Sequence, residues 1–91
     1  MLAVTQGVLV DPVQPSALEI IHDKLRLRVL PATAPIATWA GLGTGVICDG
    51  CDGRIHGKDL EHEVLLADGA VLRFHARCAL VWEALRQGFG L

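Results

Sequence analysis

Two stretches decide the fold of this chain: Val46-Ile-Cys48-Asp-Gly-Cys51-Asp-Gly53 and His75-Ala-Arg-Cys78. Each holds a pair of metal-ligand residues with two residues between them, and 23 residues separate Cys51 from His75. A tight turn aims the sulfur atoms of Cys48 and Cys51 at one point. We expect His75 and Cys78 to share one face of a helix that begins there. The four side chains therefore predict a structural zinc (Zn2+) site with three sulfur ligands and one nitrogen ligand.

The turn around the first pair carries further signals. Gly50 and Gly53 are expected to supply the unusual dihedrals of such a turn, and its backbone N–H groups can donate to the sulfur atoms. The N-terminus of the following helix favours the thiolate of Cys78. Asp49 and Asp52 are expected to raise the pKa of the neighbouring thiols. That effect argues against a reactive redox pair.

Other interpretations of the same residues stay open at this point. Three reduced cysteines and a histidine can lie in an ordinary core, in a degenerate site that binds no metal, or around a redox Cys-x-x-Cys pair. A redox pair normally follows a βαβ pattern, which is not predicted around Cys48. Iron also accepts such ligands, but this spacing favours zinc. His22, His56 and His62 are predicted to lie on the surface rather than to bind metal.

An α+β fold is predicted from the elements around the ligands. Residues 62–67 and 70–74 have strand-like patterns, and Asp68-Gly69 between them predicts a two-residue turn of type I′. In that register Leu65 faces Leu72. The pattern then becomes helical from His75 to Gln87 and ends at Gly88.

Residues 1–45 are predicted to form an N-terminal arm, and residues 46–91 the zinc-binding domain. The arm begins with a short strand at Val8–Val10. It continues with a helix over about 16–29, which a capping box of Ser16 and Glu19 opens and Pro31 ends. The inner face of this helix carries Leu18, Ile21, Leu25 and Val29. A Pro/Gly-rich, irregular connector over 31–45 follows, with Trp39 as an anchor against the domain.

Composition indicates a folded chain that needs support beyond its own core. The chain has 91 residues, of which 52% are hydrophobic and mostly aliphatic. Domains of this size commonly add a metal ion or a partner chain. The aliphatic excess favours a surface buried between subunits, although an aliphatic core gives the same composition. We therefore expect a protein partner or a homo-oligomer.

Charge and hydropathy exclude several other classes. Eight basic and ten acidic residues give a net charge of -2, unlike the basic surface of a nucleic-acid binder. No apolar run reaches the roughly 18 residues of a spanning helix, and the first ten residues lack the basic region of a signal peptide. We expect a cytoplasmic protein without membrane contact, whose three cysteines stay reduced.

Catalysis is not expected. A catalytic zinc ion needs an open coordination position, whereas four ligands in one motif close the shell. Glu83 lies two turns beyond His75 and is predicted to be a solvated charge. Ser16, the only serine, is better placed as a cap than as a nucleophile. We identify no small-molecule substrate and predict that the protein is not an enzyme.

The order of ligands and elements resembles the treble-clef zinc fold, in which a knuckle, a hairpin and a helix surround the metal. The Cys-x2-Cys…His-x2-Cys set is similar to the first zinc module of LIM domains, although no second module is present. From about Trp39 to Arg86 the chain also resembles short bacterial proteins of uncharacterised function. These proteins pair a CxGC turn with a later RFHxxCxxxW segment. The resemblance implies the four ligands named above and no activity.

Three functions are compatible with these observations. The leading hypothesis is a zinc-stabilised protein-interaction module that self-associates. The second is a nucleic-acid-binding or transcription-linked zinc protein, with Arg73, Arg77 and Arg86 near phosphate groups. The third is a thiol-based redox or zinc sensor, in which oxidation couples Cys48 to Cys51 and releases the metal.

Overall fold

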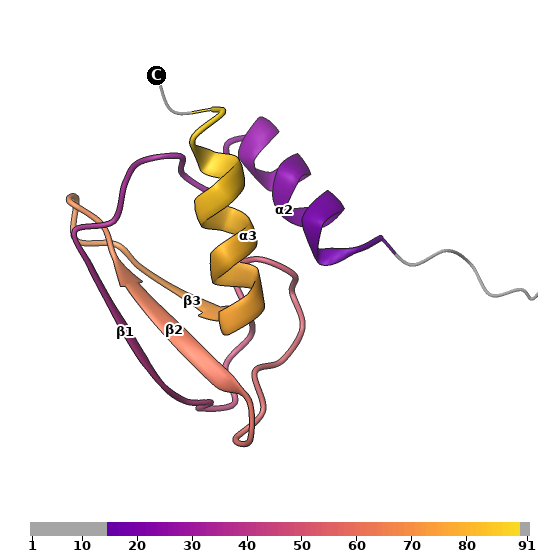
Figure 1. Ribbon diagram of the computed structural model, residues 1–91, viewed down its shortest axis with the longest axis vertical. Coiled ribbons are helices and arrows are strands. Elements are labelled where there is room, and N and C mark those ends of the chain that lie inside the picture. Colours follow the sequence, from indigo (N-terminus) through magenta and orange to yellow (C-terminus); the bar gives the residue numbers. More distant parts are fainter. Residues whose placement is uncertain (1–14, 90–91) are drawn as a thin grey trace, which may run out of the picture.

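Residues 15–89, the part described by a computed structural model, form a small α+β structure (Figure 1). In chain order the elements are α2 (Ala17–Arg26), β1 (Ala37–Leu42), β2 (Leu60–Leu65), β3 (Val71–His75) and α3 (Ala76–Arg86). The three strands form one antiparallel sheet in the order β1-β2-β3. Helix α3 packs over β2 and β3, and α2 packs against α3. The strand predicted at Val8–Val10 lies outside the described residues.

None of the helices within residues 15–89 combines the length and the hydropathy that a membrane crossing requires.

Helix α2 begins at the predicted capping box. The Oγ atom of Ser16 accepts a hydrogen bond from the Glu19 backbone N–H at 3.2 Å, and Oε1 of Glu19 accepts one from the Ser16 N–H at 2.8 Å. The helix ends at Arg26, before Pro31 as expected but earlier than the predicted residue 29. The early end follows from the backbone at Arg28, which leaves the helical region.

A Schellman motif closes α2 with an arginine where glycine is the usual residue. The N–H of Val29 donates to the carbonyl of Lys24 at 2.8 Å, and the N–H of Arg28 donates to that of Leu25 at 3.1 Å. Arg28 has a φ of 62°. This left-handed conformation costs a residue with a Cβ atom about 1–2 kcal/mol.

Replacing Arg28 with glycine is expected to raise the free energy of unfolding by about 0.5–1 kcal/mol, since glycine adopts the left-handed conformation without the steric cost. Urea unfolding at equal metal loading measures this change. Leu27→Gly is the matched control, because Leu27 has a φ of -88° and gains nothing from glycine. An equal loss of stability in both variants would contradict the assignment of strain to Arg28.

The β2–β3 hairpin forms at the predicted Asp68-Gly69 position, but its predicted register is wrong by one residue. Leu65 pairs with Val71 rather than with Leu72. Gly69 has a φ of 91°, whereas Asp68 is not left-handed. A type I′ turn needs a positive φ at both of its central residues. The observed connection is instead a three-residue loop, in which a type I turn is followed by a glycine bulge.

The predicted irregular connector contains a strand, so that prediction is wrong. Residues 37–42 form β1, which pairs antiparallel with β2 from Ala37 opposite Leu65 to Leu42 opposite Leu60. Alanine and glycine are poor strand formers, so β1 exists because β2 offers a partner edge. Trp39 is 53% exposed and is therefore not the anchor that we expected.

The buried core joins the N-terminal helix to the metal-ligand half. The side chains of Phe74 and Trp82 are almost fully buried, and their rings stack with centroids 5.4 Å apart. The Trp82 indole N–H donates to the carbonyl of Pro31 at 2.9 Å. Ile21 and Leu25 of α2 belong to the same cluster, whereas the other two predicted inner positions of that helix are exposed. Residues from both sides of position 45 thus share one core.

A carboxylate is buried on the sheet face turned away from α3. Glu61 is 5% exposed and accepts hydrogen bonds from the Thr44 N–H at 2.9 Å and the Thr44 hydroxyl at 2.8 Å. Nη1 of Arg73 lies 3.2 Å from its second oxygen. Burial raises the pKa of Glu61, but the Thr44 hydrogen bonds and the Arg73 charge outweigh burial. The net pKa is below the ordinary value.

Replacing Glu61 with glutamine is expected to lower the free energy of unfolding by about 1–2 kcal/mol at pH 7. Because the folded-state pKa is lowered, the ionised carboxylate stabilises the fold above the ordinary pKa of 4.5, and this contribution is lost as pH falls through the folded-state value. The difference between variant and wild type should therefore shrink below that pH in denaturant titrations. Both proteins keep the same metal ligands, so a difference that stays constant with pH would contradict this role.

Candidate metal centre

Cys48, Cys51, His75 and Cys78 come from three places in the fold and meet at one point. Cys48 and Cys51 lie in a loop before β2, here called the knuckle and defined as residues 48–53. His75 is the last residue of β3, and Cys78 lies in the first turn of α3. His75 therefore occupies the N-cap position of α3 with extended backbone and no side-chain capping hydrogen bond, rather than lying inside the helix as predicted.

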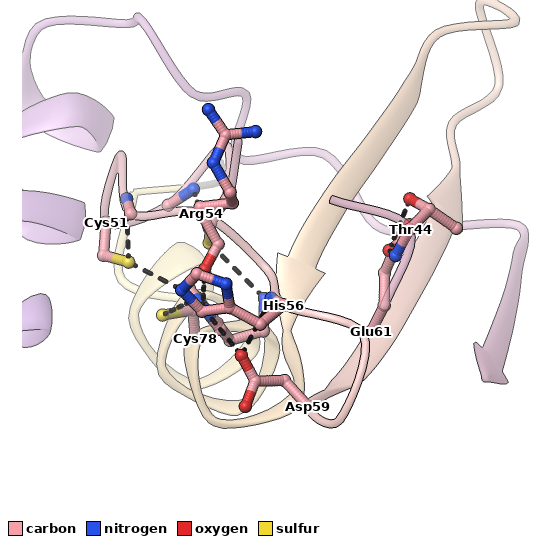
Figure 2. Close-up of polar contacts among 11 residues, drawn as sticks. Thr44, Cys51, Arg54, His56, Asp59, Glu61 and Cys78 are labelled. Atoms are coloured by element: carbon pink, nitrogen blue, oxygen red, sulfur yellow. Dashed lines mark hydrogen bonds and ion pairs between the residues drawn. The ribbon is translucent and has the colours of Figure 1, made fainter. Parts of the chain in front are cut away.

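The ligand atoms are close enough to share one ion. All four lie within 4.8 Å of one another. Nδ1 of His75 is 3.4 Å from Sγ of Cys51 and 3.9 Å from Sγ of Cys78. Figure 2 shows the side chains of Cys51 and Cys78 pointing into the same space. Cys48 and Cys78 are buried, and the other two ligands are half-buried. Spacing and donor chemistry fit a metal site.

Backbone N–H groups surround the sulfur atoms, as the sequence predicts for the knuckle. The N–H of Gly50 donates to Sγ of Cys48 at 3.3 Å, and the N–H of Gly53 donates to Sγ of Cys51 at 3.4 Å. The N–H of His75 adds a second donor to Cys48 at 3.4 Å. These donors stabilise thiolates and hold them in the orientation that a metal ion requires.

The imidazole of His75 is fixed by contacts at its other nitrogen. Nε2 lies 3.0 Å from the carbonyl oxygen of Arg54, which can only accept, so Nε2 carries the proton and Nδ1 is free to bind metal. A carboxylate oxygen of Asp59 lies 4.0 Å from Nε2, and Asp59 is itself held by the N–H of His56 at 2.9 Å (Figure 2). Such contacts orient a ligand histidine and fix which ring nitrogen carries the proton.

The two buried thiols have opposite pKa shifts. A hydrogen bond from the Cys78 thiol is the main cause that lowers the pKa of Cys48 to about 4, with backbone N–H groups also contributing and burial opposing them. The same hydrogen bond, together with burial, raises the pKa of Cys78. The arrangement therefore favours a thiolate at Cys48 even before a metal ion binds.

Backbone geometry corrects one expectation for the knuckle. The positive φ falls on Asp52, at 68°, and not on Gly50 or Gly53. Gly50 is needed for close packing instead, because a Cβ atom there would lie 3.1 Å from side-chain atoms of both Ile21 and Phe74. The knuckle thus packs directly against α2 and the hydrophobic core.

The acids beside the thiols are engaged elsewhere. Asp49 accepts a hydrogen bond from the Arg73 N–H at 2.8 Å, and Asp52 accepts one from Nζ of Lys24 at 2.6 Å. Lys24, in α2, also donates to the Asp49 carbonyl at 3.0 Å. We expected these acids to raise the pKa of the neighbouring thiols; at Cys48 the net shift of the pKa is downward, because hydrogen-bond donors dominate.

The remaining candidate residues lie outside the cluster. His56 is exposed, and His62 is half-buried rather than fully on the surface. His22 is exposed, and its ring contacts the Phe89 ring edge-on, with centroids 5.3 Å apart. Ser16 serves as the helix cap. None of these side chains joins the cluster of four.

The arginines considered for phosphate contact are mostly paired. Arg73 contacts Glu61, and its Nη2 lies 2.6 Å from Glu63. Arg86 contacts Glu83 at 2.6 Å, so Glu83 is paired rather than simply solvated. Arg77 is exposed on α3.

Compared with protein families, curated proteins and solved structures, the chain has no significant match. The interpretation of this site therefore rests on its own geometry and ligand chemistry.

Proposed function

We propose that the four residues hold a structural zinc ion at the centre of a treble-clef-like arrangement. Zinc–sulfur bonds of about 2.3 Å and a zinc–nitrogen bond of about 2.0 Å at tetrahedral angles place sulfur and nitrogen about 3.5 Å apart. The two spacings from His75, 3.4 and 3.9 Å, lie on either side of this value. Three thiolates and an imidazole suit zinc better than the oxygen-preferring cations. The order of knuckle, hairpin and helix supports the treble-clef comparison.

A structural role follows from the closed ligand set. Four protein side chains fill a tetrahedral shell and leave no position for a reacting water molecule. Cys48 and Cys78 are almost fully buried among core residues, so the ion would act as part of the core. We infer that the metal contributes folding free energy and that the protein is not an enzyme.

A role in protein association is supported by the apolar surface. Contiguous exposed apolar surface marks interaction sites, and Ile36, Trp39 and Leu42 are all exposed on or next to β1. The exposed large hydrophobic residues are Leu18, Leu27, Val29, Ile36, Trp39, Leu42, Ile47, Leu60, Val71, Leu80 and Phe89. We propose that the protein is a small zinc-stabilised interaction module that associates with a second copy of itself. The nucleic-acid hypothesis is weaker, because Arg73 and Arg86 are engaged by glutamates.

The convergence of the four ligand atoms within 4.8 Å carries the metal part of this proposal. Elemental analysis of purified protein should find one zinc ion per chain. Light scattering coupled to size exclusion should find a mass above that of the monomer, increasing with concentration. A metal-free folded chain would overturn the zinc proposal, and a strict monomer at millimolar concentration would overturn self-association.

A further inference from the structure

The two edges of the sheet differ in whether another segment covers them. The knuckle covers the outer edge of β3: the Asp49 N–H donates to the Arg73 carbonyl at 2.8 Å, and the His75 N–H donates to Sγ of Cys48 at 3.4 Å. Strand β1 forms the opposite edge (Figure 1). Within residues 15–89, no element pairs with its outer side.

The register identifies the backbone groups that face this open side. In an antiparallel pair, residues that bond across alternate with residues whose N–H and C=O groups point away. The N–H of Gly43 donates to the Asp59 carbonyl at 2.9 Å. In the register of β1 and β2, Gly41, Trp39 and Ala37 therefore also form backbone hydrogen bonds with β2. The N–H and C=O groups of Thr38, Ala40 and Leu42 therefore point outward.

Strand β1 lacks the features that normally protect an edge. Natural edge strands carry lysine, proline or inward-pointing charges that prevent pairing with another chain. No charged residue occurs between Ile36 and Gly45, and β1 is exposed from Thr38 to Leu42. An uncharged edge with unpaired donors and acceptors is complementary to another uncharged strand.

We propose that this edge pairs with β1 of a second copy of the chain, antiparallel about a twofold axis at Ala40. The inference rests on the self-association proposed above and assigns its interface. In this register, Ala40 faces Ala40, Thr38 faces Leu42, and Trp39 faces Gly41 of the second copy. Neither strand brings a charge, so no like-charge repulsion opposes their approach.

On the face turned away from α3, the register matches a large residue with a small one. Trp39 is 53% exposed. The space above Gly41 is open, because a Cβ atom added there would meet no atom within 4 Å. Each indole would lie across the glycine of the other copy and cover its backbone, a pairing that stabilises glycine in strands.

On the face covered by α3, the proposed register places Leu42 next to a cavity of the other copy. A cavity of about 140 Å³ lies between the sheet and α3, with Pro35, Thr38 and Leu80 among its lining residues. Leu42 is 70% exposed and Leu80 is 69% exposed. Leu42 of one copy pairs with Thr38 of the second copy on this face. In this arrangement its side chain reaches the rim of the second copy's cavity and contacts Leu80 of that copy.

This β1–β1 pairing produces a dimer and not an open-ended assembly. Joining two β1 edges leaves the two β3 edges at the ends of the combined sheet, where the knuckle of each copy bonds to Arg73 and His75. A twofold contact whose outer β3 edges are occupied by the knuckle at Arg73 and His75 gives a dimer rather than a fibre. One strand pair buries less than a standard interface, so we expect a dissociation constant on the order of ten micromolar.

Amide hydrogen exchange of the full chain with zinc bound, followed by NMR across a concentration series, tests this interface. The amides of Thr38, Ala40 and Leu42 should become protected as concentration rises. Those of Trp39 and Gly41 already bond to β2 and should be protected throughout, which makes them an internal control for folding. Leu42→Lys should weaken dimerisation about 100-fold, because it places two charges at the edge. Leu27→Lys, a control at the C-cap of α2 where the side chain is 61% exposed, should not change it.

Each outcome separates this inference from the broader proposal. A wild-type dimer in which Thr38, Ala40 and Leu42 exchange freely would place the interface elsewhere; it would overturn the inference and leave self-association standing. Protection that does not depend on concentration would mean that another occupant covers the edge, and would also overturn it. A monomer at all concentrations would overturn both. The wild-type exchange data decide the matter even if Leu42→Lys fails to fold.

Discussion

Replacing Cys78 with serine is expected to abolish tight zinc binding and to leave the chain largely unfolded at 25 °C. The side chain of Cys78 is 1% exposed and lies in the core cluster. Zinc binding to sites of this type contributes about 10–16 kcal/mol of apparent free energy. Small domains have a total stability of only about 5–15 kcal/mol. Loss of the metal therefore removes as much free energy as the fold is expected to possess.

Far-UV circular dichroism and NMR dispersion, measured with and without added zinc, check this expectation. His56→Ala is the control, because His56 is exposed and lies outside the ligand cluster. The control should keep its zinc and its unfolding midpoint. A Cys78→Ser protein with native dispersion and an unchanged midpoint would mean that the core folds without the metal.

Replacing Trp82 with alanine is expected to cost about 3–5 kcal/mol, the second largest effect. The indole is 1% exposed and stacks on Phe74. Its N–H donates to the carbonyl of Pro31, in the segment that follows α2. The substitution would create a cavity beside the metal centre and release the contact between this segment and α3.

Trp82→Phe separates the two contributions of this side chain. Phenylalanine retains stacking on Phe74 but loses the hydrogen bond to Pro31, so we expect a loss of about 1–2 kcal/mol. Urea unfolding of both variants at saturating zinc measures the two values. If Trp82→Ala cost no more than Trp82→Phe, the ring would not be a main element of the core.

The cluster of four candidate ligands was predictable because its determinants are local. Two residues between Cys48 and Cys51, and two between His75 and Cys78, restrict each pair to one turn of backbone. The Asp68-Gly69 sequence between the two pairs predicts a hairpin, and a hairpin brings the pairs together. The capping box at Ser16 was equally readable, since both hydrogen bonds lie within three residues. Features of this kind follow from short sequence windows.

Features that depend on distant partners were missed. Strand β1 contains alanine, glycine and threonine in no alternating pattern, and it forms because β2 presents an edge to it. The exposure of Trp39 follows from that pairing. The hairpin register was missed for a local reason: it depended on whether Asp68 adopts a positive φ, which an Asp-Gly sequence alone does not determine. The burial of Glu61 required Thr44, which only the fold brings near.

Zinc-edge X-ray absorption of the purified protein tests the central claim most directly. We expect three sulfur atoms at about 2.3 Å and one nitrogen atom at about 2.0 Å around each zinc ion. A shell of nitrogen and oxygen atoms only, or a folded chain that carries no metal ion, would contradict the account.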